Sequence, residues 1–64
     1  MNFLIHFVGD DENVIHDEIM LEAPPDVGTY VKYYGTMMEV NSVMLVLQRG
    51  QQPFYRVSLS EVEI

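Results

Sequence analysis

Length, composition and charge exclude several classes of protein before any motif is considered. The chain has 64 residues, 48% of them hydrophobic and 20% charged, which suits one small folded domain spanning residues 1–64. It contains no cysteine, and its longest apolar run, Val43 to Leu47, is far shorter than the roughly 20 residues that a membrane-spanning helix needs. Ten acidic residues against three basic ones give a net charge of −7, which argues against direct binding to nucleic acid or to an anionic membrane.

A domain this small is expected to need a partner. It buries only about 60% of the surface of its unfolded chain, and it has no cysteine with which to form disulfides. The excess of acid favours a basic partner, because an acidic surface steers encounter with a positive groove; the same charge also keeps a small apolar protein in solution. Residues 1–8 lack the basic start and cleavage site of a secretory signal, so a cytoplasmic location is expected.

Four clusters of turn-forming residues divide the chain into five stretches of about 7 to 13 residues, the spacing of short strands joined by turns. The clusters are residues 9–13, 23–26, 34–35 and 49–53. In the first stretch, apolar residues alternate from Phe3 to Phe7, as in a strand with one buried face. The opposite face of this strand leaves Leu4 and Val8 without a place in the core.

The second stretch, residues 12–23, fits two structures. As a strand, it places Ile15, Ile19 and Leu21 on one face. As a helix, it would be capped by Asp11 and ended by Pro24, giving an α+β fold in which one helix covers a four-stranded sheet. The strand is the favoured interpretation.

The last three stretches predict strands by the same alternation and by their β-branched and aromatic residues. In the fourth stretch the apolar pattern changes phase at Asn41 and Ser42, which predicts a β-bulge or bend. Beyond that point Val43, Leu45 and Leu47 are expected in the core, and Met44 and Val46 are left over. The fifth stretch carries alternating acids near its end, which suit an edge strand.

From residue 25 to residue 43, the spacing of the proline, glycine and valine residues follows a pattern known from other small proteins. Pro25, Val27, Gly28, Val31, Gly35, Val40 and Val43 resemble the P-x-V-G-x-x-V … G … V-x-x-V pattern of small SH3-like barrels, which include short accessory proteins of phages and plasmids. The resemblance covers about a third of the chain and departs from the pattern at Thr29 and Met38. It implies a fold only: an all-β, five-stranded SH3-like small barrel or a strongly bent antiparallel sheet.

Candidate chemistry is sparse. Five residues flank the first turn with groups that suit a divalent transition metal: His6, Asp10, Asp11, His16 and Asp17. Their spacing is not that of a dedicated site, and a solvated acidic turn is the favoured interpretation. No nucleophile motif or phosphate-binding glycine loop is present, so we predict a protein without catalytic activity, cofactor or metal.

The apolar residues left outside the core indicate an interaction surface instead. The predicted anchors are Leu4, Val8, Tyr30, Tyr34, Met44 and Val46, and the predicted charged contacts are Asp10, Asp11, Glu12, Asp26 and Glu39. The sequence therefore predicts a non-enzymatic protein-binding module: an acidic, phage-type inhibitor whose carboxylates replace phosphates in the basic groove of a nucleic-acid-handling protein. The alternatives are a homo-oligomeric structural subunit and an oligomer that sequesters a small ligand between its subunits.

Overall fold

The computed structural model of the protein describes residues 2–9 and 17–62, and in this part of the chain it contains five strands and no helix. The strands are β1 (Phe3–Gly9), β2 (Asp17–Leu21), β3 (Tyr30–Tyr33), β4 (Thr36–Val46) and β5 (Phe54–Glu61). The all-β, five-stranded prediction is confirmed. Since β2 is a strand, the helical alternative for residues 12–23 is wrong over that part; residues 12–16 lie outside the described residues.

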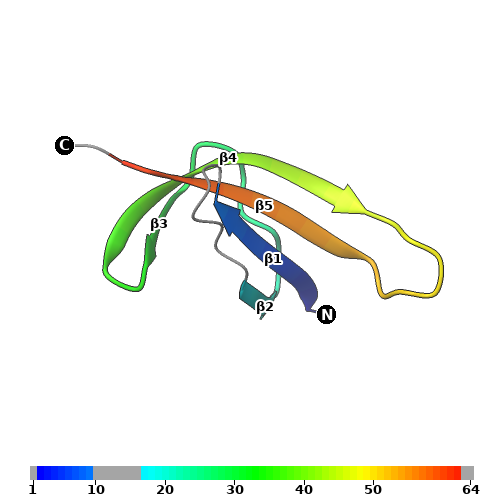
Figure 1. The fold of residues 1–64 in the computed structure, drawn as a ribbon. Coiled ribbons are helices and arrows are strands. Elements are labelled where there is room, and N and C mark those ends of the chain that lie inside the picture. Colours follow the sequence, from blue (N-terminus) through cyan, green and yellow to red (C-terminus); the bar gives the residue numbers. More distant parts are fainter. Residues whose placement is uncertain (1, 10–16, 63–64) are drawn as a thin grey trace.

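The strands form one sheet in the order β2-β1-β5-β4-β3, curled strongly into a half-barrel (Figure 1). Three of the four neighbouring pairs are antiparallel, as expected of a bent antiparallel sheet. The pair β1–β5 is parallel, with Ile5 opposite Tyr55 and Phe7 opposite Val57. The first and last strands therefore pair at the centre of the sheet, and β2 and β3 form its two edges.

The core lies on the inner face of the curl, where the alternating apolar residues of every strand converge. Ile5, Val57 and Leu59 are 0% exposed and Val40 is 1% exposed. Phe7 and Met38 complete the buried cluster. Six partly buried residues pack around it: Ile19, Leu21, Val31, Tyr33, Val43 and Tyr55. In β2 the alternation of Ile19 and Leu21 explains why this short stretch is a strand rather than a helix.

The predicted bulge in the fourth stretch is confirmed. Val40 pairs with Leu59, but the next pair along the two strands is Ser42 with Ser58, so Asn41 is the extra residue. The insertion lets Val40 and Val43 both face the core although they are three residues apart. Bulges also bend a strand and increase its twist, which helps β4 to curl around the core.

The hairpin of β4 and β5 extends beyond the rest of the sheet (Figure 1). Along its outer edge, β4 pairs with β3 only from Thr36 to Glu39. One residue further, the Gly28 amide donates to the Val40 carbonyl at 2.9 Å and the Val40 amide donates to the Thr29 carbonyl at 2.9 Å. Within the described residues, no strand pairs with this edge from Ser42 onward. We call residues 42–54 the open arm.

Candidate functional site

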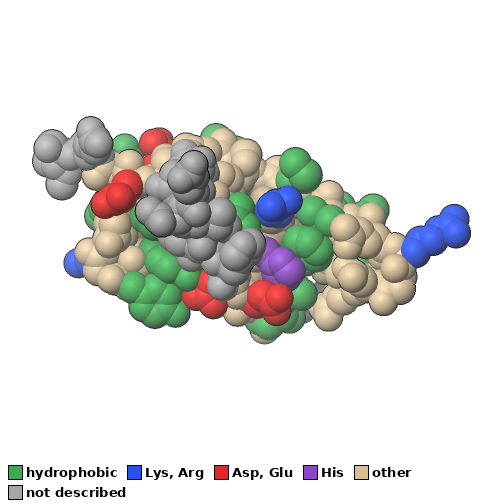
Figure 2. Space-filling view, in the orientation of Figure 1, with side chains coloured by type: hydrophobic (Ala, Val, Ile, Leu, Met, Phe, Trp, Pro, Cys, Tyr) green, Lys and Arg blue, Asp and Glu red, His purple; other side chains and the backbone are tan. Residues whose placement is uncertain are grey.

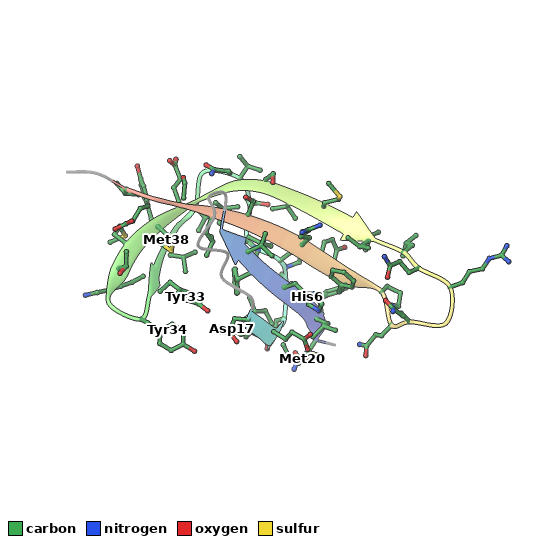
Figure 3. The ribbon with its side chains drawn as sticks, viewed as in Figure 1. His6, Asp17, Met20, Tyr33, Tyr34 and Met38 are labelled. Carbon is green, nitrogen blue, oxygen red and sulfur yellow. The ribbon has the colours of Figure 1, made fainter. Side chains whose placement is uncertain are left out.

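Two tyrosines at one edge of the sheet bind a carboxylate at the opposite edge, across the mouth of the half-barrel (Figure 3). Tyr33 Oη donates to Asp17 Oδ2 at 2.7 Å, and Tyr34 Oη donates to the same oxygen at 3.1 Å. The Phe7 ring lies beneath, 6.1 Å from the Tyr33 ring in an edge-on arrangement. We call Asp17, Tyr33 and Tyr34 the edge cluster. It joins β2 to β3, which share no backbone pairing in the described residues.

The hydrogen bonds of the edge cluster fix its protonation state. Burial raises the pKa of Tyr33 to about 12, and the hydrogen bond to Asp17 acts in the same direction. The hydrogen bond from Tyr33 lowers the pKa of Asp17, against a smaller opposing effect of desolvation. The bond to Asp17 likewise raises the pKa of Tyr34. At neutral pH the cluster is therefore one carboxylate that accepts hydrogen bonds from two neutral phenols.

Tyr34 occupies an unusual backbone position. With Gly35 it forms the two-residue turn between β3 and β4, and the φ angles are 48° for Tyr34 and 89° for Gly35. Positive φ at both positions is typical of a type I′ hairpin, where Asn and Gly are the usual residues. A residue other than Asn or Gly destabilises the folded state by about 1–2 kcal/mol when its backbone is in the left-handed region. Tyr34 is nevertheless 83% exposed, so core burial does not offset that cost.

Three further predicted contact residues lie around β3. Tyr30 is 64% exposed and stands opposite Glu39 in the β3–β4 register. Asp26 belongs to the turn before β3, where its carbonyl accepts from the Thr29 amide at 3.1 Å. We call Asp17, Asp26, Tyr30, Tyr34 and Glu39 together the acid–aromatic surface. Its members do not share one face: Tyr30 and Glu39 lie on the outer face of β3 and β4, and Tyr34 lies in the turn beyond β3. Four of its five members were predicted from the sequence; Asp17 was predicted only as a metal candidate.

The other predicted anchors lie elsewhere. Met44 pairs with Arg56, and Val46 pairs with Phe54, near the hairpin end of β4. Tyr34 lies at the other end of β4, roughly 30 Å along the strand at the usual rise per strand residue. That Met44 and Val46 share one contact patch with Tyr34 stays a prediction.

The predicted anchors on β1 are less accessible than expected. Val8 is only 8% exposed; it lies on β1, which has β2 on one side and β5 on the other. Leu4 is half-buried. Val8 is therefore removed from the candidate contact residues. Three predicted acidic contacts, Asp10, Asp11 and Glu12, lie outside the described residues.

The inner face of the sheet is open at the hairpin end, and this the sequence did not predict. Leu45 and Leu47, expected in the core, are 51% and 69% exposed. The physical reason is the shortness of β3, which ends the curl before it covers this part of the face. A hollow of about 320 Å³ results, with no charged residue among those that line it: Asn2, Phe3, Leu4, Leu45, Leu47, Gln52, Pro53 and Tyr55.

Charge is distributed unevenly along the chain and over the molecule. Residues 40–60 contain Arg49 and Arg56 but no acid, whereas the remaining residues carry all ten acids and Lys32, a net −9 against +2. On the face shown in Figure 2, no Asp or Glu lies at the hairpin end. This interval of 21 residues without a carboxylate in an acidic chain is the sequence signal that identifies the open arm as a separate surface.

The metal candidates have protein partners in the part of the site that is described. His6 Nε2 lies 3.4 Å from Glu18 Oε1, and the His6 ring stacks on Phe54 at 3.8 Å. Asp17 accepts from the two tyrosines. Residues 2–9 and 17–62 hold no group of three or more His, Asp or Glu side chains able to bind a metal ion. Asp10, Asp11 and His16 lie outside the described residues.

Comparison with known proteins gives no relative. No protein-family model matches the chain, and no curated protein or solved structure matches it either. Within the described residues no helix has the length and apolar character to cross a membrane.

Proposed function

We propose that the protein is a non-enzymatic protein-binding module that docks its acid–aromatic surface on a basic surface of another protein. The observation that carries the proposal is Tyr34, an aromatic side chain held in solvent at a strained backbone position beside carboxylates. A basic groove that normally holds nucleic acid is the partner that suits this chemistry, and occupying it would make the protein an inhibitor.

The conformation of Tyr34 supports a role in binding. Strained residues that gain little from burial concentrate at functional sites. The hydrogen bond to Asp17 and the edge contact with Tyr33, at 4.5 Å between ring centroids, hold the Tyr34 ring in place before a partner arrives. A ring that is already ordered loses little entropy on binding, and tyrosine is enriched among the residues that dominate interface energies.

The charges around β3 support a basic partner. Asp17, Asp26 and Glu39 lie near the two exposed tyrosines, and Lys32 is the one basic residue in the chain outside residues 40–60. Such a surface attracts a groove rich in Lys and Arg and accelerates encounter at low ionic strength. The carboxylates would take the places of phosphates in that groove.

The test is capture of partners from cell extract at low and high salt, followed by binary affinity measurement with the purified partner. Tyr30→Ser and Tyr34→Asn are the test variants. Met44→Ser is the matched control, because Met44 is 57% exposed and Tyr30 is 64% exposed.

We expect to capture a basic protein that binds the parent and the Met44→Ser control with equal affinity. Its affinity for the two tyrosine variants should be at least about tenfold lower. Binding should also weaken as salt screens the charges. Failure to capture any basic protein, or capture that neither salt nor the tyrosine variants change, would overturn the proposal.

A further inference from the structure

We infer that the open arm binds the open arm of a second copy of the chain, with the two β4 strands paired antiparallel across a twofold axis at Leu45. This interaction uses a surface separate from the acid–aromatic surface and goes beyond the proposed function. It would join two half-barrels into one continuous sheet of ten strands.

The direction of the backbone groups in β4 carries the inference. The Val40 amide and carbonyl point away from β5, toward the turn before β3. Because opposite residues of an antiparallel pair either exchange both hydrogen bonds or make none, the amide and carbonyl of Leu59, the β5 partner of Val40, also point away from β4. By alternation Val57 and Tyr55 do the same. Their β4 partners, Val43 and Leu45, therefore point amide and carbonyl groups to the outer edge.

A strand edge can pair with the same edge of a second copy across a twofold axis, because each contact between two residues is then repeated with the copies exchanged. With Leu45 on the axis, Val43 of each copy stands opposite Leu47 of the other. Val43 and Leu45 then direct their backbone groups at the second strand, and Leu47 follows directly beyond the end of β4. Unprotected edges of this kind are the usual sites of strand addition.

The side chains on the same strand favour this pairing. Val43, Leu45 and Leu47 belong to the inner face, and Leu45 and Leu47 are more than half exposed at the hollow. Pairing would bring the two hollows together and remove this apolar surface from water. Stable interfaces bury about 600–1,000 Å² from each copy, so contact between the two hollows must add to the pairing of the strand edges.

The charge distribution identifies the occupant as a second copy rather than another protein. Two chains of charge −7 repel each other, but the arm is the part without carboxylates, so the two acidic regions stay apart. Arg49 lies in the hairpin turn of the arm, where the Gln51 amide donates to the Gln48 carbonyl at 3.3 Å. The antiparallel arrangement directs this turn of each copy along the β4 edge toward the acidic part of the other copy.

The first experiment measures mass by sedimentation equilibrium over a range of concentrations. The parent should move from 7.4 kDa toward twice that mass. Leu45→Lys should remain monomeric and folded, whereas Met20→Lys should dimerise like the parent, because Met20 is 49% exposed but lies on the outer face of β2. A parent that stays monomeric at every concentration, or two variants that behave alike, would overturn the inference.

Two further variants separate edge pairing from loose apolar contact. A synthetic chain with an N-methyl group on the Leu45 amide keeps every side chain and removes one outward donor, and its dimer should dissociate at least about tenfold more readily. Arg49→Asp should weaken the dimer, because it places a carboxylate on the arm. A dimer that is insensitive to N-methylation is held by another surface and overturns the inference. The proposed function is tested separately, because it depends on Tyr30 and Tyr34 and not on Leu45.

Discussion

Replacing Gly35 by L-alanine tests the turn that presents Tyr34. The φ angle of Gly35 is 89°, a conformation that residues with a Cβ rarely adopt. A Cβ built at this position has no heavy atom within 4 Å, so a clash cannot contribute to the effect. The whole loss of stability then measures the backbone conformation.

The expected magnitude follows from this geometry. An L-residue in the left-handed region costs about 1–2 kcal/mol, and the lower entropy of the unfolded alanine chain offsets part of that. The net loss should be about 1 kcal/mol. For a domain of this size, that lowers the unfolding temperature by about 4–8 °C.

The assay is thermal unfolding followed by circular dichroism, with a synthetic Gly35→D-alanine chain as control. D-alanine adds the same methyl group but prefers positive φ, so it should raise stability by about 0.4–1 kcal/mol through the unfolded state. Opposite signs for the two enantiomers are the expected result. Equal effects, or no effect of L-alanine, would show that the turn is not the one described.

Four other measurements test the account. Tyr34→Asn relieves the backbone strain but loses the hydrogen bond to Asp17, so these two effects oppose each other and the free energy of unfolding should stay within about 1 kcal/mol of the parent. The same variant should weaken partner binding, as a calorimetric titration would show. The lowered pKa of Asp17 contributes stability that is complete above the ordinary value of 3.8 and is lost as the pH falls through the lowered one; Tyr33→Phe should flatten this acid dependence of the urea midpoint. The raised pKa of Tyr33 contributes stability that is complete below 10.0 and is lost between 10.0 and about 12. Tyrosinate absorbance should show the Tyr33 phenol ionising with a pKa of about 12 and the Tyr34 phenol ionising with a pKa above its usual range. Leu59→Ala should cost about 2–5 kcal/mol in urea unfolding, whereas Leu47→Ala, at an exposed site, should change stability by less than about 0.5 kcal/mol.

Features with a two-residue period could be predicted from the sequence. The alternation around Ile5 and Phe7 identified the buried face of β1, and both side chains are buried. The change of phase at Asn41 identified the bulge, because one inserted residue reverses the faces of all later residues. These signals depend on neighbours in the chain, so no tertiary information was needed.

Features that depend on where strands end could not be predicted. Leu45 has the same face and the same apolar character as Val43, yet it is more than half exposed because β3 does not extend beside it. The parallel pairing of β1 with β5 joins distant parts of the chain and leaves no local pattern. The bonds from Tyr33 and Tyr34 to Asp17 likewise span 16 and 17 residues, and an alternating pattern gives no means of pairing them.

The most direct test of the account is amide hydrogen exchange at Leu45 and Met44, measured by NMR at low and high protein concentration. The Met44 amide belongs to the β4–β5 ladder, so it should be protected at both concentrations. The Leu45 amide points to the open edge, so it should exchange fast in dilute solution and slowly when the chain is concentrated. If the Leu45 amide exchanges at the same rate at both protein concentrations, whether fast or slow, the result would contradict the pairing of two open arms.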